Sequence, residues 1–196
     1  LARYHAALRA RGPLAPGAPV NLPSLAHPAP ASGAARAARH PATFLGATSV
    51  LAGRVEIAED AGIYFACVVD AGDARIAIGA RSNVQDNTFL VTDARRGDLV
   101  IGDDVTIGHN VRMGSGSVGH RALVGMSAIV GDNVVVEDGA CIGAGAHVEP
   151  GTRVPTGWIY AGRPARPFRE LKPAERDGFA DIITVYAHYS AVYRGG

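Results

Sequence analysis

Aliphatic residues recur at every sixth position through the middle of the chain. The series consists of Leu45, Leu51, Ile57, Ile63, Val69, Ile78, Val84, Leu90, Ile101, Ile107, Met113, Val118, Val124, Val130, Val136, Ile142, Val148 and Val154. The step from Met113 to Val118 is five residues, and two longer interruptions, Asp70–Ala77 and Val91–Val100, break the register. An α-helix would repeat every 3.6 residues, whereas short strands joined by regular corners can repeat every six. The pattern predicts an all-β solenoid in which the two interruptions are projecting loops.

Small residues complete each repeat. Glycine follows many of the aliphatic positions, as at Gly79, Gly102 and Gly108. Because glycine adopts backbone dihedral angles that other residues avoid, we expect these glycines to allow the chain to turn the corners. The two cysteines, Cys67 and Cys141, are too few for a disulfide framework. We expect both to be packed, unreactive thiols at small inward positions.

The segments on either side of the repeat differ from it in composition. Residues 1–42 form a basic extension rich in proline and alanine, and no acidic residue precedes Glu56. Within it, residues 1–11 have the spacing of a short amphipathic helix, and residues 12–35 are typical of an extended proline-rich chain. The composition also resembles a mitochondrial transit peptide. Residues 43–160 hold the repeat, and residues 161–196 form a linker and a C-terminal helix.

The C-terminal helix is predicted from Pro173 to Arg194, because its aromatic and aliphatic residues recur at steps of three and four. We expect it to pack along a face of the solenoid or against a neighbouring subunit. The whole chain carries 19 Lys+Arg against 18 Asp+Glu, and the resulting net charge of +1 argues against nucleic-acid binding.

Three motifs narrow the interpretation further. Residues 78–87 read IGARSNVQDN, residues 105–109 read VTIGH, and residues 118–128 read VGHRALVGMSA. Together with the segment AGRPA at residues 161–165, they resemble the γ-class carbonic anhydrases, a family of hexapeptide-repeat proteins. The resemblance implies a left-handed parallel β-helix with a C-terminal α-helix, assembled as a trimer.

The resemblance also identifies positions of a metal site. Members of that family hold zinc between subunits with three histidines, and the matching positions here are Val91, His109 and Gly114. Neither valine nor glycine offers a side-chain ligand, and one imidazole does not hold catalytic zinc. The resemblance therefore implies no cofactor in this chain, unless neighbouring subunits supply the missing zinc ligands.

What remains is a vestigial site of Gln85, Asp86 and His109. The family's Arg-Gly-Asp is replaced by Asp70-Ala71-Gly72, so Asp86 is expected to lack its arginine partner and, with Gln85, to form hydrogen bonds across a subunit interface. His120 is the other histidine that could serve as a metal ligand. Residues of adjacent repeats lie on different faces of the coil, however, so we expect His120 to point away from His109.

Two classes of function follow. The resemblance favours a structural or assembly subunit rather than an enzyme: a γ-carbonic-anhydrase-like protein in a trimer with related subunits, on the matrix side of mitochondrial respiratory complex I. The N-terminal extension and the C-terminal helix would then attach it to the larger membrane complex. The alternative is an enzyme, either a free-standing γ-class carbonic anhydrase, mitochondrial or from the cytoplasm of a bacterium, or a hexapeptide acyltransferase. An acyltransferase would need a general-base histidine, which could be His109 or His120.

Overall fold

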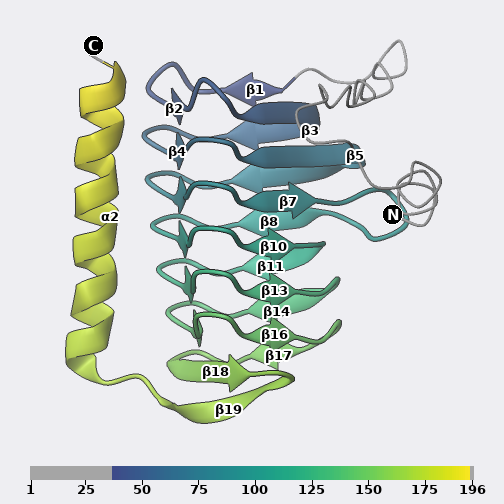
Figure 1. Cartoon of the computed structure of the whole chain (residues 1–196), viewed down its shortest axis with the longest axis vertical. Helices are drawn as coiled ribbons and strands as arrows, with labels where there is room; N and C mark the ends of the chain where they lie inside the picture. Colours follow the sequence, from purple (N-terminus) through teal and green to yellow (C-terminus); the bar gives the residue numbers. More distant parts are fainter. Residues whose placement is uncertain (1–36, 195–196) are drawn as a thin grey trace, which may run out of the picture. The chain divides into compact units, whose positions relative to one another are not determined.

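The structure, a computed structural model, describes residues 37–194, so the expectations for the extension before residue 37 lie outside it. A stack of short strands is followed by one long helix, α2 (Pro173–Arg194) (Figure 1). The strands are β1 (Ala38–Arg39), β2 (Phe44–Leu45), β3 (Val50–Ile57), β4 (Gly62–Ile63), β5 (Val68–Ile78), β6 (Asn83–Val84), β7 (Phe89–Val91), β8 (Leu99–Ile101), β9 (Thr106–Ile107), β10 (Arg112–Met113), β11 (Gly116–Val118), β12 (Leu123–Val124), β13 (Ile129–Val130), β14 (Val134–Val136), β15 (Cys141–Ile142), β16 (His147–Val148), β17 (Arg153–Val154), β18 (Trp158–Gly162) and β19 (Ala165–Glu170).

The strands form three faces of a parallel solenoid. The helix face consists of β2, β4, β6, β9, β12, β15 and β18, each paired in parallel with the next, which gives about seven turns. The second face contains β7, β10, β13 and β16, and the third contains β8, β11, β14 and β17. The long strands β3 and β5 run along both the second and the third face. This arrangement confirms the predicted β-solenoid.

The core is the interior of the coil. Every aliphatic residue of the six-residue series from Ile57 to Val154 is buried, and Leu45 and Leu51 at the open end are partly buried. Each turn stacks these side chains on the equivalent side chains of the turn before. Ile107, for example, pairs with Val84. The apolar area removed from water along this column is the main stabilising contribution to the fold.

Glycine has a different role at the corners from the one expected. The left-handed dihedral angles fall two residues after the glycines, on residues such as Asn110 (φ 57°) and Ser127 (φ 59°). Glycine is required instead because successive turns approach closely: a Cβ on Gly79 would lie 2.4 Å from the carbonyl carbon of Gly102, and one on Gly108 would lie 2.7 Å from the Met126 nitrogen. Backbone stacking, rather than conformational freedom, therefore explains these glycines.

The two interruptions of the repeat also differ from each other. Residues 70–77 do not project as a loop, because β5 continues through them from Val68 to Ile78 and remains paired with β3 across a bulge. The second interruption does leave the coil: β7 ends at Val91, and the chain returns to the third face at Leu99. The turn between them is closed by the Asp93 carboxylate, which accepts backbone N–H bonds from Arg95 and Arg96.

The C-terminal segment closes the coil and then covers it. Strand β19 pairs antiparallel with β18, which adds a strand to the segment expected to be a linker. The predicted helix Pro173–Arg194 is confirmed, and it lies along the helix face. Its first turn is held by Glu175, which accepts a hydrogen bond from the Lys172 N–H at 2.8 Å and pairs with Arg169. No helix among residues 37–194 is long and apolar enough to cross a membrane.

The two cysteines occupy different surroundings. Cys67 lies in the interior of the coil as expected. Cys141 does not: it packs with Ile159 and Leu171, against Phe179 of α2, and therefore points outward from the solenoid and beneath the helix. The expected inward position of Cys141 was wrong because the inward residue of that strand is Ile142. Burial raises the pKa of Cys67 to about 11 and that of Cys141 to about 12.

Candidate functional site

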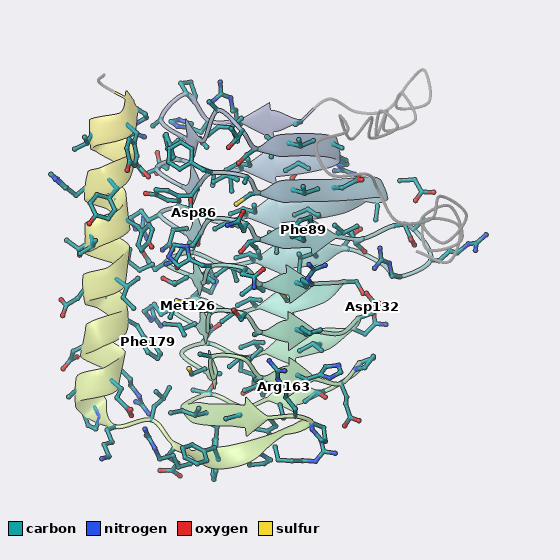
Figure 2. The ribbon with its side chains drawn as sticks, viewed as in Figure 1. Asp86, Phe89, Met126, Asp132, Arg163 and Phe179 are labelled. Carbon is teal, nitrogen blue, oxygen red and sulfur yellow. The ribbon has the colours of Figure 1, made fainter. Side chains whose placement is uncertain are left out.

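Asp86 and His109 lie one above the other at the corner between the helix face and the second face. Asp86 follows β6 and His109 follows β9, and these strands are neighbours in the sheet. The Asn110 N–H donates to the Asp86 carbonyl at 2.9 Å, and the Ser127 N–H donates to the His109 carbonyl at 2.8 Å. These bonds place Asp86, His109 and Met126 in successive turns; Asp86 and Met126 are labelled beside the helix in Figure 2.

The Asp86 carboxylate connects two turns of the corner. Its Oδ1 accepts the backbone N–H of Phe65 at 2.9 Å, and its Oδ2 lies 3.3 Å from His109 Nδ1. Because a carboxylate only accepts hydrogen bonds, this contact favours the tautomer with its hydrogen on Nδ1, which leaves the lone pair on Nε2. Both side chains are 38% exposed, which leaves the imidazole accessible to a small molecule.

The remaining nitrogen of His109 faces the C-terminal helix. The Tyr186 hydroxyl lies 3.1 Å from His109 Nε2, although the two residues are 77 positions apart in the sequence. In the tautomer with its hydrogen on Nδ1, Nε2 accepts this hydrogen bond and the phenol O–H donates it. In the sequence, Tyr186 is one of the aromatic residues that form the apolar stripe of the predicted helix. No sequence spacing indicates which turn of the solenoid its hydroxyl reaches.

Tyr64 fixes the position of Tyr186. The Tyr64 hydroxyl donates to the Tyr186 carbonyl oxygen at 2.6 Å and lies 2.9 Å from Ser190 Oγ. The two tyrosine rings meet edge to face with centroids 4.9 Å apart. Tyr64 and Ser190 are only 3% and 2% exposed, and burial is the main cause that raises the pKa of Tyr64 to about 12. The helix is therefore held to the solenoid by hydrogen bonds at the level of the site.

Gln85 lies beside the site but does not enter it. It is buried, and its amide donates to Asn83 Oδ1 at 3.1 Å. The Asn83 amide in turn donates to Thr106 Oγ1 at 3.0 Å. Gln85 thus belongs to a polar row on the outside of the helix face, and the hydrogen bonds of Gln85 and Asp86 described here form within one chain.

The residues at the family's zinc positions do not fit zinc. Val91 has no donor atom and ends β7 beside Asp70. At Gly114 a Cβ would lie 2.0 Å from Asp132 Oδ1, so a side chain there would require the Asp132 carboxylate to move. That carboxylate is held by the Ser115 N–H at 3.1 Å, and Arg96 lies 3.7 Å from it. Nor do residues 37–194 contain any group of three or more His, Cys, Asp and Glu able to hold a metal ion.

His120 lies at a different corner from His109. Its Nδ1 accepts the backbone N–H of Asp103 at 3.0 Å. The backbone N–H of His120 donates to Asp138 Oδ1 at 2.9 Å. It borders a shallow groove of about 530 Å³ on the third face, together with Glu137 and Arg153. Since Glu137 is paired with Arg153 and holds the Thr156 N–H, this part of the groove is occupied by structural contacts.

Exposed apolar side chains surround the Asp86–His109 corner. Phe65, Met126 and Ile129 are large, exposed hydrophobic residues of the described part of the chain. Phe89 projects from the second face, where the Arg112 guanidinium lies over its ring at 5.1 Å (Figure 2). An apolar surface next to a polar site is typical of a site covered by another chain.

Comparisons with known proteins place this fold in a family. No protein-family model matches the chain, and no curated protein matches it. Among solved structures, a hexapeptide transferase family protein from Anaplasma phagocytophilum is 33% identical, with a TM-score of 0.76 over 80% of this chain and 92% of that one. A candidate acetyltransferase from Bacillus cereus is 31% identical, with a TM-score of 0.79 over 84% of this chain and 94% of its own.

A more distant structure shares the fold alone. The N-acyltransferase AntD from Bacillus cereus, solved with dTDP and coenzyme A, is 17% identical and has a TM-score of 0.59 over 73% of this chain and 90% of its own. None of these three proteins is named as a carbonic anhydrase or a respiratory subunit, so that part of the resemblance stays a prediction. The fold and the two relatives above 30% identity agree: the chain belongs to the hexapeptide-repeat transferase family, whose fold is the left-handed parallel β-helix.

Proposed function

We propose that the protein is an acyltransferase that uses His109 as its general base. One observation carries the proposal: the His109 imidazole is held between the Asp86 carboxylate and the Tyr186 hydroxyl. A carboxylate on Nδ1 fixes the tautomer in which Nε2 is basic, and it stabilises the imidazolium that forms when a proton is taken up. The family names of the two relatives support the same reaction class.

The reaction follows from these positions. His109 Nε2 takes the proton of an acceptor amine or hydroxyl as that group attacks the carbonyl carbon of an acyl thioester. The tetrahedral intermediate then collapses, the thiolate leaves, and the imidazolium returns the proton to it. Asp86 does not change its protonation state, because its part is to orient and stabilise the imidazole. The chain needs no metal for this sequence of steps.

We further propose that a second copy of the chain covers the corner. Two observations support a self-trimer: Phe65, Met126 and Ile129 are exposed beside the site, and the groove at His120 lies on another face. A neighbouring subunit would bury those side chains and turn an open corner into a cleft. A uniform monomer in analytical ultracentrifugation at micromolar concentration would contradict this assembly.

A purely structural role is the second candidate. It is favoured by the engagement of both ring nitrogens of His109 within the chain and by the Asp132 carboxylate that occupies the space beside Gly114. In this reading the trimer is a scaffold, formed with itself or with related chains, and the extension before residue 43 attaches it to a larger membrane complex. Deletion of residues 1–42 would then release the trimer from that complex without dissociating it.

A thiol-release assay separates the two candidates. The full chain is incubated with acetyl-CoA and a panel of primary amines, amino sugars and alcohols, and free coenzyme A is measured with a thiol reagent. The acyltransferase proposal predicts release that depends on the acceptor and saturates with it. If no acceptor raises the release above the rate without protein, while the chain is folded, the proposal is wrong and the structural role gains support.

A further inference from the structure

Tyr186 occupies the position next to the ring nitrogen of the proposed base. In the tautomer with its hydrogen on Nδ1, the lone pair of His109 Nε2 accepts the hydrogen bond of the Tyr186 hydroxyl at 3.1 Å. A direct approach of an acceptor to Nε2 would have to displace the phenol. The phenol oxygen, however, keeps lone pairs of its own that can accept a hydrogen bond while its hydrogen remains directed at the imidazole.

The position of the phenol is determined by the fold rather than by the substrate. The Tyr64 hydroxyl holds the backbone carbonyl of Tyr186 at 2.6 Å, and the Tyr64 ring packs edge-on against the Tyr186 ring. These contacts restrict the Tyr186 side chain, so its hydroxyl is prepared for transfer before any substrate binds.

The surroundings keep the phenol protonated at neutral pH. Burial is the main cause that raises the pKa of Tyr186, and the charge of Asp86 adds to the same effect. The titratable groups that face it are His109 and Asp86 from the solenoid, Tyr64 from the helix face and Tyr189 from α2 itself. A phenol that does not ionise by itself can still accept one proton while it releases another.

Building on the proposed acyl transfer, we propose that Tyr186 relays the proton of the acceptor to His109. The acceptor N–H or O–H donates to the phenol oxygen. As the acceptor nitrogen or oxygen bonds to the thioester carbon, its proton passes to the phenol oxygen and the phenol proton passes to His109 Nε2. When the carbon–sulfur bond breaks, the same two transfers run in reverse and deliver the proton to the thiolate.

The relay limits what the acceptor can be. The attacking group must carry a hydrogen to donate, so a neutral primary or secondary amine or an alcohol fits, and a tertiary amine or a carboxylate does not. A protonated amine has no lone pair for attack, so acceptors with a lower amine pKa should react faster at neutral pH.

The test compares Tyr186→Phe with Tyr189→Phe in the full chain. Tyr189→Phe is the matched control, because Tyr189 is exposed and contacts Tyr186 only through its ring. For Tyr186→Phe we expect kcat to fall by roughly 100-fold while the KM for the thioester stays within about twofold; Tyr189→Phe should change neither. The ¹⁵N NMR signal of His109 Nε2 in the free protein should move in Tyr186→Phe and stay in place in Tyr189→Phe.

The two readouts separate this proposal from the one on which it rests. If the wild type transfers acyl groups and Tyr186→Phe retains full kcat, the relay is wrong and the acyltransferase proposal stands. If the NMR signal does not move in Tyr186→Phe, the hydrogen bond to His109 is absent and the relay is wrong for that reason. If the NMR signal moves but the wild type transfers no acyl group, the acyltransferase proposal fails, and the relay fails with it.

Discussion

Substitution of Gly116 by alanine tests why the repeat shortens at one corner. The five-residue step from Met113 to Val118 leaves only Gly114 and Ser115 between β10 and β11. Gly116 consequently has a φ of +131°, and a Cβ on it would lie 2.1 Å from the Val134 carbonyl oxygen. That neighbour is backbone in β14, so the strand itself must move.

The size of the effect can be compared with a matched glycine. Gly139 also has a positive φ, +62°, but a Cβ added to it would meet nothing within 4 Å. Gly139→Ala should therefore cost only the left-handed strain, about 1 kcal/mol. Gly116→Ala adds the displacement of paired strands to a strain of about 1–3 kcal/mol, for a total of at least about 4 kcal/mol. For a chain of this size each kcal/mol lowers the Tm by about 2–4 °C, so the Tm of Gly116→Ala should fall by about 8 °C or more.

Thermal unfolding of the full chain, followed by far-ultraviolet circular dichroism, measures both variants. The expected result is a Tm lowered by about 2–4 °C in Gly139→Ala and by at least twice as much in Gly116→Ala. Equal decreases in the two variants would refute the reasoning, because they would mean that β14 accommodates a methyl group without cost. A decrease of about 20 °C or more in Gly139→Ala would refute it from the other side.

Three further predictions concern the core, the helix and the thiols. Leu90→Ala should lower the free energy of unfolding in urea by about 3 kcal/mol, because the side chain is fully buried in the coil; a loss below about 1 kcal/mol would contradict its place in the core. The hydrogen bond from Arg169 lowers the pKa of Glu175 to about 2, so the stabilisation it gives is present above about pH 4.5 and is lost as the pH falls toward 2. Amide exchange in α2 should therefore accelerate in that range, and Glu175→Gln should remove this pH dependence. Cys67 and Cys141 should not react with a thiol reagent at pH 8 until the chain unfolds, because burial raises both pKa values; modification of folded protein within minutes would contradict their burial.

The interior of the fold could be predicted from the sequence because one rule generates it. Each turn adds a residue such as Val84, Ile107 or Val124 to the same column, so the period itself identifies the buried side. The C-terminal helix could be predicted for the same reason, since one stripe of apolar residues selects its inner face. The role of glycine at the corners was harder to predict from the sequence. Gly79 and Gly108 are required because the backbone of the next turn lies close to them, and a local sequence pattern does not contain that contact.

The candidate site could be predicted only in part. Asp86 and His109 lie in motifs, and the six-residue period places them in neighbouring turns. The contact of His109 with Tyr186 depends on how far α2 slides along the solenoid, and that is determined by tertiary contacts such as the Tyr64 hydrogen bonds. The filling of the space beside Gly114 by Asp132 likewise comes from the following turn, 18 residues further on.

The central claim is that His109 is the base of an acyl transfer, and a comparison of two histidine variants tests it most directly. His109→Ala and His120→Ala are assayed for coenzyme A release with the best acceptor of the wild type, at equal protein concentration. His120 is the matched control, because it is an exposed histidine at another corner and its imidazole accepts the Asp103 N–H. The account predicts that His109→Ala lowers kcat by about 100-fold or more and that His120→Ala leaves it within about twofold. A His109→Ala protein as active as the wild type, or an activity lost only in His120→Ala, would contradict it.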